Sequence, residues 1–137
     1  MHIFGQSGKK IIKTEIAKCL IPIEELPVPD YDDLDLDMYT SPKRILPYYV
    51  SRSCFWGKCA FCDCDYGYDG KYRVKSVNKV LRDISVLRKK YNTEMIYFID
   101  EALSVHFIEK MCDAIDEDNK FFWFAYIRAN KKFTYEL

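Results

Sequence analysis

Four cysteines lie close together in the stretch SRSCFWGKCAFCDCDYG, which spans residues 51–67: Cys54, Cys59, Cys62 and Cys64. Four residues separate the first two cysteines, two residues separate the next two, and one residue separates the last two. Thiols at such spacing serve three kinds of site, namely a disulfide that staples the fold, a closed zinc site, or an iron–sulfur cluster.

The N-terminus argues against the disulfide. The stretch MHIFGQSGKKIIKTEIAKCL has no basic region followed by a long apolar run, and no stretch of about 18 apolar residues offers a membrane span. We therefore expect a cytoplasmic protein, and thiols in the cytoplasm stay reduced. Clustered cysteines in that compartment are more often metal ligands than disulfides.

The other cysteines and histidines argue against zinc. A structural zinc site usually draws two pairs of ligands from separate parts of the chain, but Cys19 and Cys112 stand alone, and His2 and His106 are scattered. Zinc would therefore need all four clustered cysteines, including a cramped C-x-C pair. An iron–sulfur cluster held by three cysteines leaves one iron free for another molecule. The role of Cys64, as a spare thiol, an alternative ligand or a fourth donor, stays open.

The bulk composition is that of one globular domain. The chain has 137 residues, of which 49% are hydrophobic and 31% are charged, and this is enough to bury a core. Because the formal net charge is zero, nothing points to a nucleic acid or an anionic membrane as a partner.

The hydrophobic pattern from residue 45 onward predicts alternating strands and helices. Short β-favouring apolar runs predict strands over 45–50, 95–100 and 121–127. Ser76 and Ser104 are candidate N-caps for amphipathic helices over 77–91 and 105–118, with Cys112 on the buried face of the second. The end of the chain predicts the opening of a third helix. This order predicts an α/β fold with a parallel sheet covered by helices.

Residues 1–44 have no such period. The stretch LIPIEELPVPDYDDLDLDMYTSP carries four prolines and many aspartates, which predicts an irregular lead-in. Its spaced apolar side chains leave two readings open, a solvated acidic linker or a segment that docks on the domain.

The predicted topology brings three groups of residues to one edge of the sheet. Ligands of parallel sheets bind beyond the carboxyl ends of the strands. The cysteine segment follows the first predicted strand, Asp100 and Glu101 end the second, and Arg128 follows the third.

The segment SRSCFWGKCAFCD, placed after a strand, resembles the cluster-binding loop of the radical S-adenosylmethionine superfamily. The common spacing there is C-x3-C-x2-C, and the first gap is one residue longer here. The stretch LPVPDYDDLDLDMYTSPKRILPYYVSRSC resembles the lead-in of members that also carry a cobalamin-binding domain. IYFIDEALS and WFAYIRANKKFTYEL resemble the second and third strands of their barrel, so the resemblance covers most of residues 25–137.

The resemblance implies a radical mechanism. Cys54, Cys59 and Cys62 would hold a 4Fe–4S cluster whose fourth iron binds S-adenosylmethionine. An electron from a donor such as flavodoxin or ferredoxin would cleave the cofactor, and the 5′-deoxyadenosyl radical would abstract hydrogen from a substrate that the sequence does not identify.

The resemblance also implies cofactor-binding residues, and none is assigned as catalytic. Phe61 would pack near the adenine, Asp100 and Glu101 would face the methionine amine, and Arg128 would pair with a carboxylate. Each has a structural alternative: a core aromatic, a solvated strand end or a structural ion pair.

The resemblance implies a partial barrel. The family's barrel has six βα units, whereas this chain supplies about three, with a lead-in over 1–44 and the N-terminal half of a barrel over 45–137. We therefore expect a fragment of an enzyme, or a chain whose open edge is covered by a partner chain or by a second copy. The alternative is a non-catalytic zinc- or cluster-binding module that docks to a partner.

Overall fold

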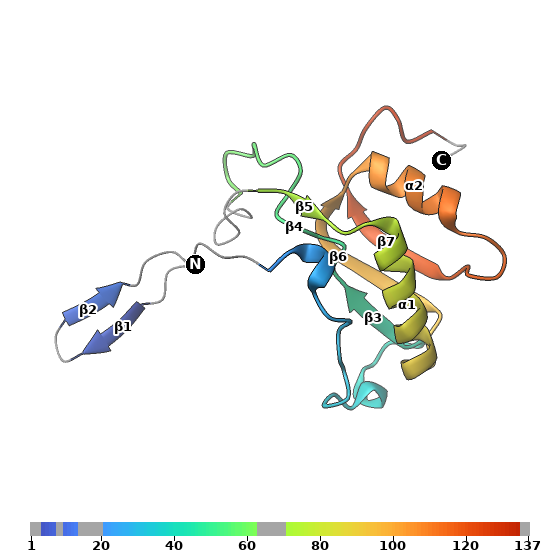
Figure 1. Cartoon of the computed structure of the whole chain (residues 1–137), viewed down its shortest axis with the longest axis horizontal. Coiled ribbons are helices and arrows are strands. Elements are labelled where there is room, and N and C mark those ends of the chain that lie inside the picture. The colour runs from blue at the N-terminus through green and yellow to red at the C-terminus, as the bar shows by residue number, and fades with distance from the viewer. Residues whose placement is uncertain (1–3, 8–9, 14–20, 63–70, 135–137) are drawn as a thin grey trace.

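The computed structural model describes residues 4–7, 10–13, 21–62 and 71–134. Its central element is a parallel sheet of three strands in the order β3 (Ile45–Tyr48), β6 (Met95–Leu103) and β7 (Phe122–Ile127) (Figure 1). The strands β3 and β7 each pair parallel with β6, with Ile45 and Phe122 both opposite Met95, so all three strands run in one direction. The predicted α/β fold with successive βα units and a parallel sheet is confirmed.

Two helices connect the strands, and each begins where the sequence predicts. The Ser76 hydroxyl accepts a hydrogen bond from the Lys79 N–H (3.2 Å) and caps α1 (Val77–Tyr91). The Ser104 hydroxyl accepts one from the Phe107 N–H (3.3 Å) and caps α2 (Val105–Ala114). Both caps satisfy N–H groups that a helix end leaves unpaired.

The hydrophobic core lies between the helices and one face of the sheet. Alternate residues of β3 and β6, such as Leu46 and Ile96, are fully buried against α1 residues such as Ile84. This alternation is what a pleated strand with one covered face requires. The prediction that Cys112 faces the core is wrong, because this side chain is exposed on α2.

The opposite face of the sheet is open. On β7 the side chains of Phe122, Phe124 and Tyr126 are 67%, 43% and 64% exposed. The sequence predicts that this strand is apolar on both faces, and the structure confirms this. Within the described part of the chain, however, only one of the two faces is covered.

A bulge interrupts β6 at its carboxyl end. Phe98 pairs with Ala125 and Leu103 pairs with Ile127, so residues 99–102 of β6 lie opposite Tyr126 alone. Bulges bend a strand and re-aim its side chains. This bulge contains Asp100 and Glu101, two of the residues predicted to bind a cofactor.

The lead-in is more ordered than the sequence predicts. Strands β1 (Phe4–Ser7) and β2 (Lys10–Lys13) pair as an antiparallel hairpin, which the irregular pattern did not suggest. Two short 3₁₀ turns follow, η1 (Ile23–Glu25) and η2 (Leu36–Met38).

The later part of the lead-in docks on the domain, so the reading as a free linker is wrong for these residues. The Tyr91 hydroxyl accepts a hydrogen bond from the Tyr31 N–H (2.7 Å) and donates to Asp30 (2.8 Å). Lys90 forms ion pairs with Asp30 (3.1 Å) and Asp32 (2.7 Å). The Asp32 N–H and the Tyr91 hydroxyl hold the pKa of Asp30 at about 2, below its ordinary value.

Two further observations complete the fold. Residues 128–134 form no helix, and residues 135–137, where the predicted third helix would continue, lie outside the described part. Within the described residues, no helix is both long enough and apolar enough to span a membrane.

Candidate functional site

The cysteine segment leaves the carboxyl end of β3 as a narrow ribbon. Strand β4 (Ser51–Arg52) pairs antiparallel with β5 (Arg73–Val74), and the Lys75 N–H donates to the Val50 carbonyl (3.0 Å). Residues 53–62 and 71–72, which lie beyond these paired strands, therefore form the described part of the ribbon tip, and the ribbon begins at the end of a buried strand. In Figure 1 this segment lies at the same end of the sheet as the chain that follows β7.

The tip carries the three cysteines predicted as metal ligands. Cys54 is half-buried, Cys59 and Cys62 are exposed, and all three are free thiols. A turn joins the last two, with the Cys62 N–H donating to the Cys59 carbonyl (3.2 Å). Gly57 has φ 54°, a left-handed conformation that glycine adopts without steric cost.

These cysteines do not converge. Across the described ranges, no three His, Cys, Asp or Glu side chains come together as a group that could hold a metal ion. Cys64 and Cys19 lie outside these ranges.

Asp100 anchors the base of the ribbon. Its carboxylate accepts hydrogen bonds from the Val50 N–H (3.0 Å), from the Ser51 N–H (2.5 Å) and from the Ser51 hydroxyl. The side chain is 1% exposed, and burial raises its pKa above the ordinary value. Asp100 therefore holds the segment in place, and its oxygens are already engaged. Its neighbour Glu101 is exposed.

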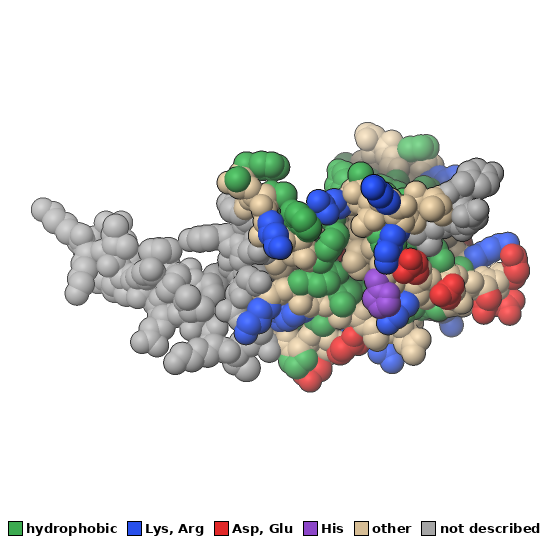
Figure 2. All heavy atoms as spheres, turned by 90° about the horizontal axis from the view of Figure 1, so that it is seen from above, with side chains coloured by type: hydrophobic (Ala, Val, Ile, Leu, Met, Phe, Trp, Pro, Cys, Tyr) green, Lys and Arg blue, Asp and Glu red, His purple; other side chains and the backbone are tan. Residues whose placement is uncertain are grey.

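Arg128 lies where the sequence predicts, beside the cysteine segment. Its guanidinium carbon is 3.6 Å from the centre of the Trp56 ring, a cation–π contact between residues on different elements. Phe61, on the same ribbon tip, is 93% exposed and is thus available to stack on a ligand. Figure 2 views the molecule from above and shows hydrophobic side chains with Lys and Arg among them in the described part.

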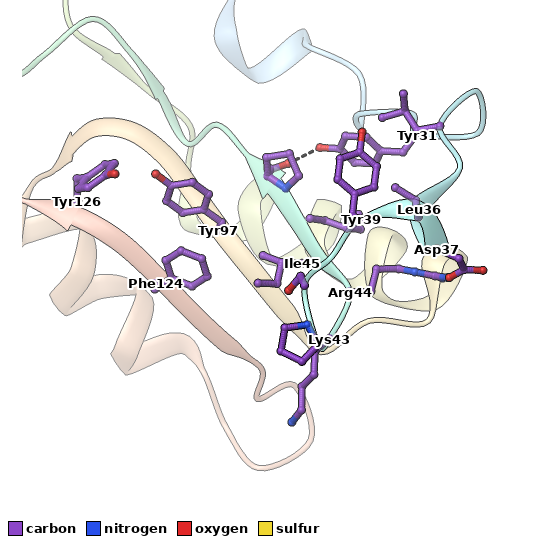
Figure 3. A pocket seen from close by; sticks show the side chains of 15 residues that line it. Tyr31, Leu36, Asp37, Tyr39, Lys43, Arg44, Ile45, Tyr97, Phe124 and Tyr126 are labelled. Atoms are coloured by element: carbon purple, nitrogen blue, oxygen red, sulfur yellow. Dashed lines mark hydrogen bonds and ion pairs between the residues drawn. The ribbon is translucent and has the colours of Figure 1, made fainter.

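A cavity of about 690 Å³ lies between the lead-in and the open face of the sheet (Figure 3). Tyr97 stacks on Phe124, with ring centres 4.5 Å apart, and meets Tyr126 edge-on at 6.0 Å. Tyr31 and Tyr39 approach from the lead-in. We call this cavity the aromatic pocket. Sequence reasoning missed it, because its walls come from segments that only the fold brings together.

A buried polar cluster lies behind the ribbon. Asp83 on α1 accepts hydrogen bonds from Lys79 Nζ (2.9 and 3.1 Å) and from the Tyr48 hydroxyl (2.7 Å). Lys75 Nζ donates to that hydroxyl (2.8 Å) and is 4.0 Å from Asp83. Burial lowers the pKa of Lys75 to about 8. In the sequence, Lys79 and Asp83 are four residues apart on the apolar side of a predicted helix. This spacing was the signal that could have indicated a buried ion pair.

The chain was compared with protein families, curated proteins and solved structures. No family model matches the chain, and no solved structure matches it. The chain is similar to a protein of Pyrococcus horikoshii named "Uncharacterized methyltransferase PH0819", with 29% identity over 107 residues. The match covers 75% of this chain and 22% of that protein, so the chain spans about a fifth of the length of this relative.

These findings correct the prediction of a radical S-adenosylmethionine enzyme. The similar protein is named a methyltransferase, a name that describes methyl transfer and not hydrogen abstraction by a radical. The described residues also gather no metal-binding group for a 4Fe–4S cluster, and the same observation counts against the alternative zinc- or cluster-binding module. The assignment of an iron–sulfur radical enzyme is therefore wrong.

Proposed function

We propose that the chain is part of a methyltransferase that uses S-adenosylmethionine. The observation that carries the proposal is the similarity to a protein named a methyltransferase. A match over 75% of the chain must include β3 and β6 wherever it begins. The similarity therefore involves the sheet and the segments that join its strands, not a peripheral element.

S-adenosylmethionine supplies a methyl group on a positively charged sulfur, ready for attack by a nucleophile. The protein has to bind the cofactor, orient it and exclude water. Parallel sheets bind ligands beyond the carboxyl ends of their strands, and this edge of the chain presents Glu101, Arg128 and Phe61. In the proposal, Arg128 pairs with the methionine carboxylate, Glu101 accepts from the amine, and Phe61 stacks on the adenine.

Asp100 has a different role in the proposal from the one that the sequence predicts. Since its carboxylate is engaged by Val50 and Ser51, it positions the ribbon that carries Phe61 and Trp56. Trp56 in turn supports Arg128 through the ring contact. The three cysteines lie on the same ribbon, and the methyl-transfer proposal gives them no metal to bind.

The aromatic pocket is next to this site along β7. Tyr126 precedes Arg128 by two residues, a separation of about 7 Å along an extended strand. Tyrosine and phenylalanine rings attract cations through their faces. In the proposal, Tyr97, Phe124 and Tyr126 therefore stabilise the sulfonium and receive the part of the acceptor that approaches it.

The open sheet face has exposed aromatic side chains, so we propose that a partner chain, a second copy or further chain covers it. The four cysteines among the described residues are free thiols, which agrees with a cytoplasmic location.

Calorimetric titration of S-adenosylmethionine into the chain tests the proposal. We expect saturable binding, and we expect Arg128→Met to weaken it at least about tenfold, as loss of a charge-assisted pair does. Arg82→Met, on the exposed side of α1, is the matched control and should leave the affinity unchanged. Absence of saturable binding would overturn the cofactor assignment, and equal binding by wild type and Arg128→Met would overturn the role of Arg128.

A further inference from the structure

A second cavity, of about 400 Å³, lies between residues 26–29 of the lead-in and the outer side of β3. Leu26, Pro27 and Pro29 form an apolar wall, and Arg52 and Lys75 also line the cavity. Two cations and no carboxylate line this space, although Asp and Glu are as frequent in the chain as Lys and Arg.

Lys75 is the unusual member of this lining. Its side chain is 95% or more buried, yet among the residues that the structure describes its Nζ donates a hydrogen bond only to the Tyr48 hydroxyl. An ammonium group has three N–H donors. Its nearest carboxylate, Asp83 at 4.0 Å, is already bonded to Lys79 and Tyr48. A buried ammonium with spare donors on a cavity wall is suited to an anion.

Arg52 supplies the second charge. Its guanidinium lies 4.3 Å from the centre of the Tyr49 ring, and Nη1 donates to the Ser51 carbonyl (3.0 Å). Stacking on an aromatic ring fixes the plane of the guanidinium and leaves donors at its edge. Arg52 and Lys75 line the same cavity, so one small anion can contact both cations.

We propose that Lys75 and Arg52 bind the carboxylate of a small organic acid, and that this acid is the methyl acceptor. The second part rests on the proposed methyl transfer. A nucleophilic atom elsewhere in the acid would form the bond to the methyl carbon while the carbon–sulfur bond of S-adenosylmethionine breaks, S-adenosylhomocysteine leaves and the proton of the nucleophile passes to solvent. A carboxylate suits the site better than a phosphate, because the Asp83 carboxylate, 4.0 Å from Lys75 Nζ, opposes a doubly charged anion. The apolar wall accommodates the body of the acid.

The cavity borders the proposed cofactor site. Tyr49 and Ile99 also line it, and they alternate with residues that face the core. Ile99 lies in the β6 bulge together with Glu101. The cavity and the proposed cofactor site therefore share the bulged segment of β6.

Titration of the chain with phenylacetate, followed by NMR chemical shifts, tests the site, with uncharged phenylacetamide as the comparison ligand. We expect phenylacetate to bind more tightly than phenylacetamide, and we expect Lys75→Met or Arg52→Gln to weaken phenylacetate binding at least about tenfold. Lys89→Met, which removes an exposed lysine of α1, should have no effect. Lys75→Met should fold, because Asp83 keeps Lys79 and Tyr48.

The same variants separate this inference from the proposed function. S-adenosylhomocysteine should bind wild type and Lys75→Met equally, since its carboxylate is assigned to Arg128. Equal phenylacetate binding by wild type and Lys75→Met, or none by wild type, would overturn the carboxylate site even if the cofactor binds. A loss of S-adenosylhomocysteine binding in Lys75→Met would assign the site to the cofactor and overturn the acceptor proposal. Phenylacetate binding without cofactor binding would leave the site standing and overturn the methyltransferase.

Discussion

The Asp100 carboxylate accepts two hydrogen bonds from Ser51, one from its backbone N–H (2.5 Å) and one from its hydroxyl. Asp100 lies in the bulge of β6, and Ser51 is the first residue of the ribbon that carries the cysteines. This contact joins the end of one parallel strand to the segment that follows its neighbour. The geometry of the candidate site therefore depends on a buried carboxylate that makes no contact with solvent.

Asp100→Asn should destabilise the protein by about 2 kcal/mol, because the amide N–H₂ must face one of the donors from Val50 or Ser51 and leave it unsatisfied. Urea unfolding followed by circular dichroism measures this change. Glu101→Gln is the control on an exposed neighbour and should change stability by less than about 0.5 kcal/mol. Equal effects of the two substitutions would contradict the anchoring role.

Lys75 gives the protein a pH-dependent stability with a defined sign. Burial lowers its pKa from 10.5 to about 8, so between these values the unfolded chain binds more protons than the folded chain. The free energy of unfolding should therefore rise with pH in this window, by about 2 kcal/mol up to pH 9.5. The charged and titratable groups around Lys75 are Asp83 and Lys79 of α1, Arg52 of β4, Tyr48 of β3 and Asp100 of β6.

Lys75→Met should remove most of this rise and should be more stable than wild type at pH 7, because the cost of burying the charge is gone. Urea unfolding at pH 7.5 and pH 9.5 measures both effects. If the free energy of unfolding rises with pH equally steeply in wild type and in Lys75→Met, a group other than Lys75 is responsible.

Asp83→Asn should be among the most destabilising substitutions in the chain. It leaves the buried ammonium groups of Lys79 and Lys75 without their carboxylate, and breaking a buried ion pair by removing one partner costs about 3–5 kcal/mol. The midpoint of thermal unfolding reports the loss. Asp113→Asn, on the exposed side of α2, is the matched control. A similar fall of the unfolding midpoint in both variants would refute the stabilising role of the Asp83 carboxylate.

The open sheet face should make the isolated chain self-associate. Phe122 is 67% exposed on β7, and Lys43 Nζ lies 6.0 Å from its ring centre. Phe122→Glu would place a carboxylate near Lys43 and should lower association in sedimentation velocity with little change in stability. Val86→Glu, at an exposed apolar position of α1, should leave association unaltered. If both variants associate like wild type, the open face is not the contact.

The regular part of the fold could be predicted from the sequence because its signals are local. Ser76 and Ser104 stand directly before amphipathic stretches, and each caps its helix. Apolar runs of strand length marked the sheet, and strict alternation with helices made it parallel. The position of Arg128 beside the cysteine segment followed from that topology.

The remaining features depend on contacts between distant segments, which no local pattern records. Asp100 continues the alternation of Ile96 and Phe98 onto the covered face of β6, where its carboxylate accepts a hydrogen bond from Ser51, 49 positions away in sequence. The lead-in docks through Tyr31, which contacts a residue 60 positions away in sequence. The cysteine spacing suggested a metal centre, but spacing alone does not determine whether the thiols converge.

The most direct test of the account uses the two tryptophans of the chain as reporters of cofactor binding. Trp56 contacts Arg128 at the proposed site, whereas the Trp123 ring packs 5.6 Å from Phe98 on the helix-covered side. Addition of S-adenosylhomocysteine to the ¹⁵N-labelled chain should shift the indole N–H resonance of Trp56 and leave that of Trp123 in place. No shift at saturating ligand, or a shift of Trp123 alone, would contradict the proposed cofactor site.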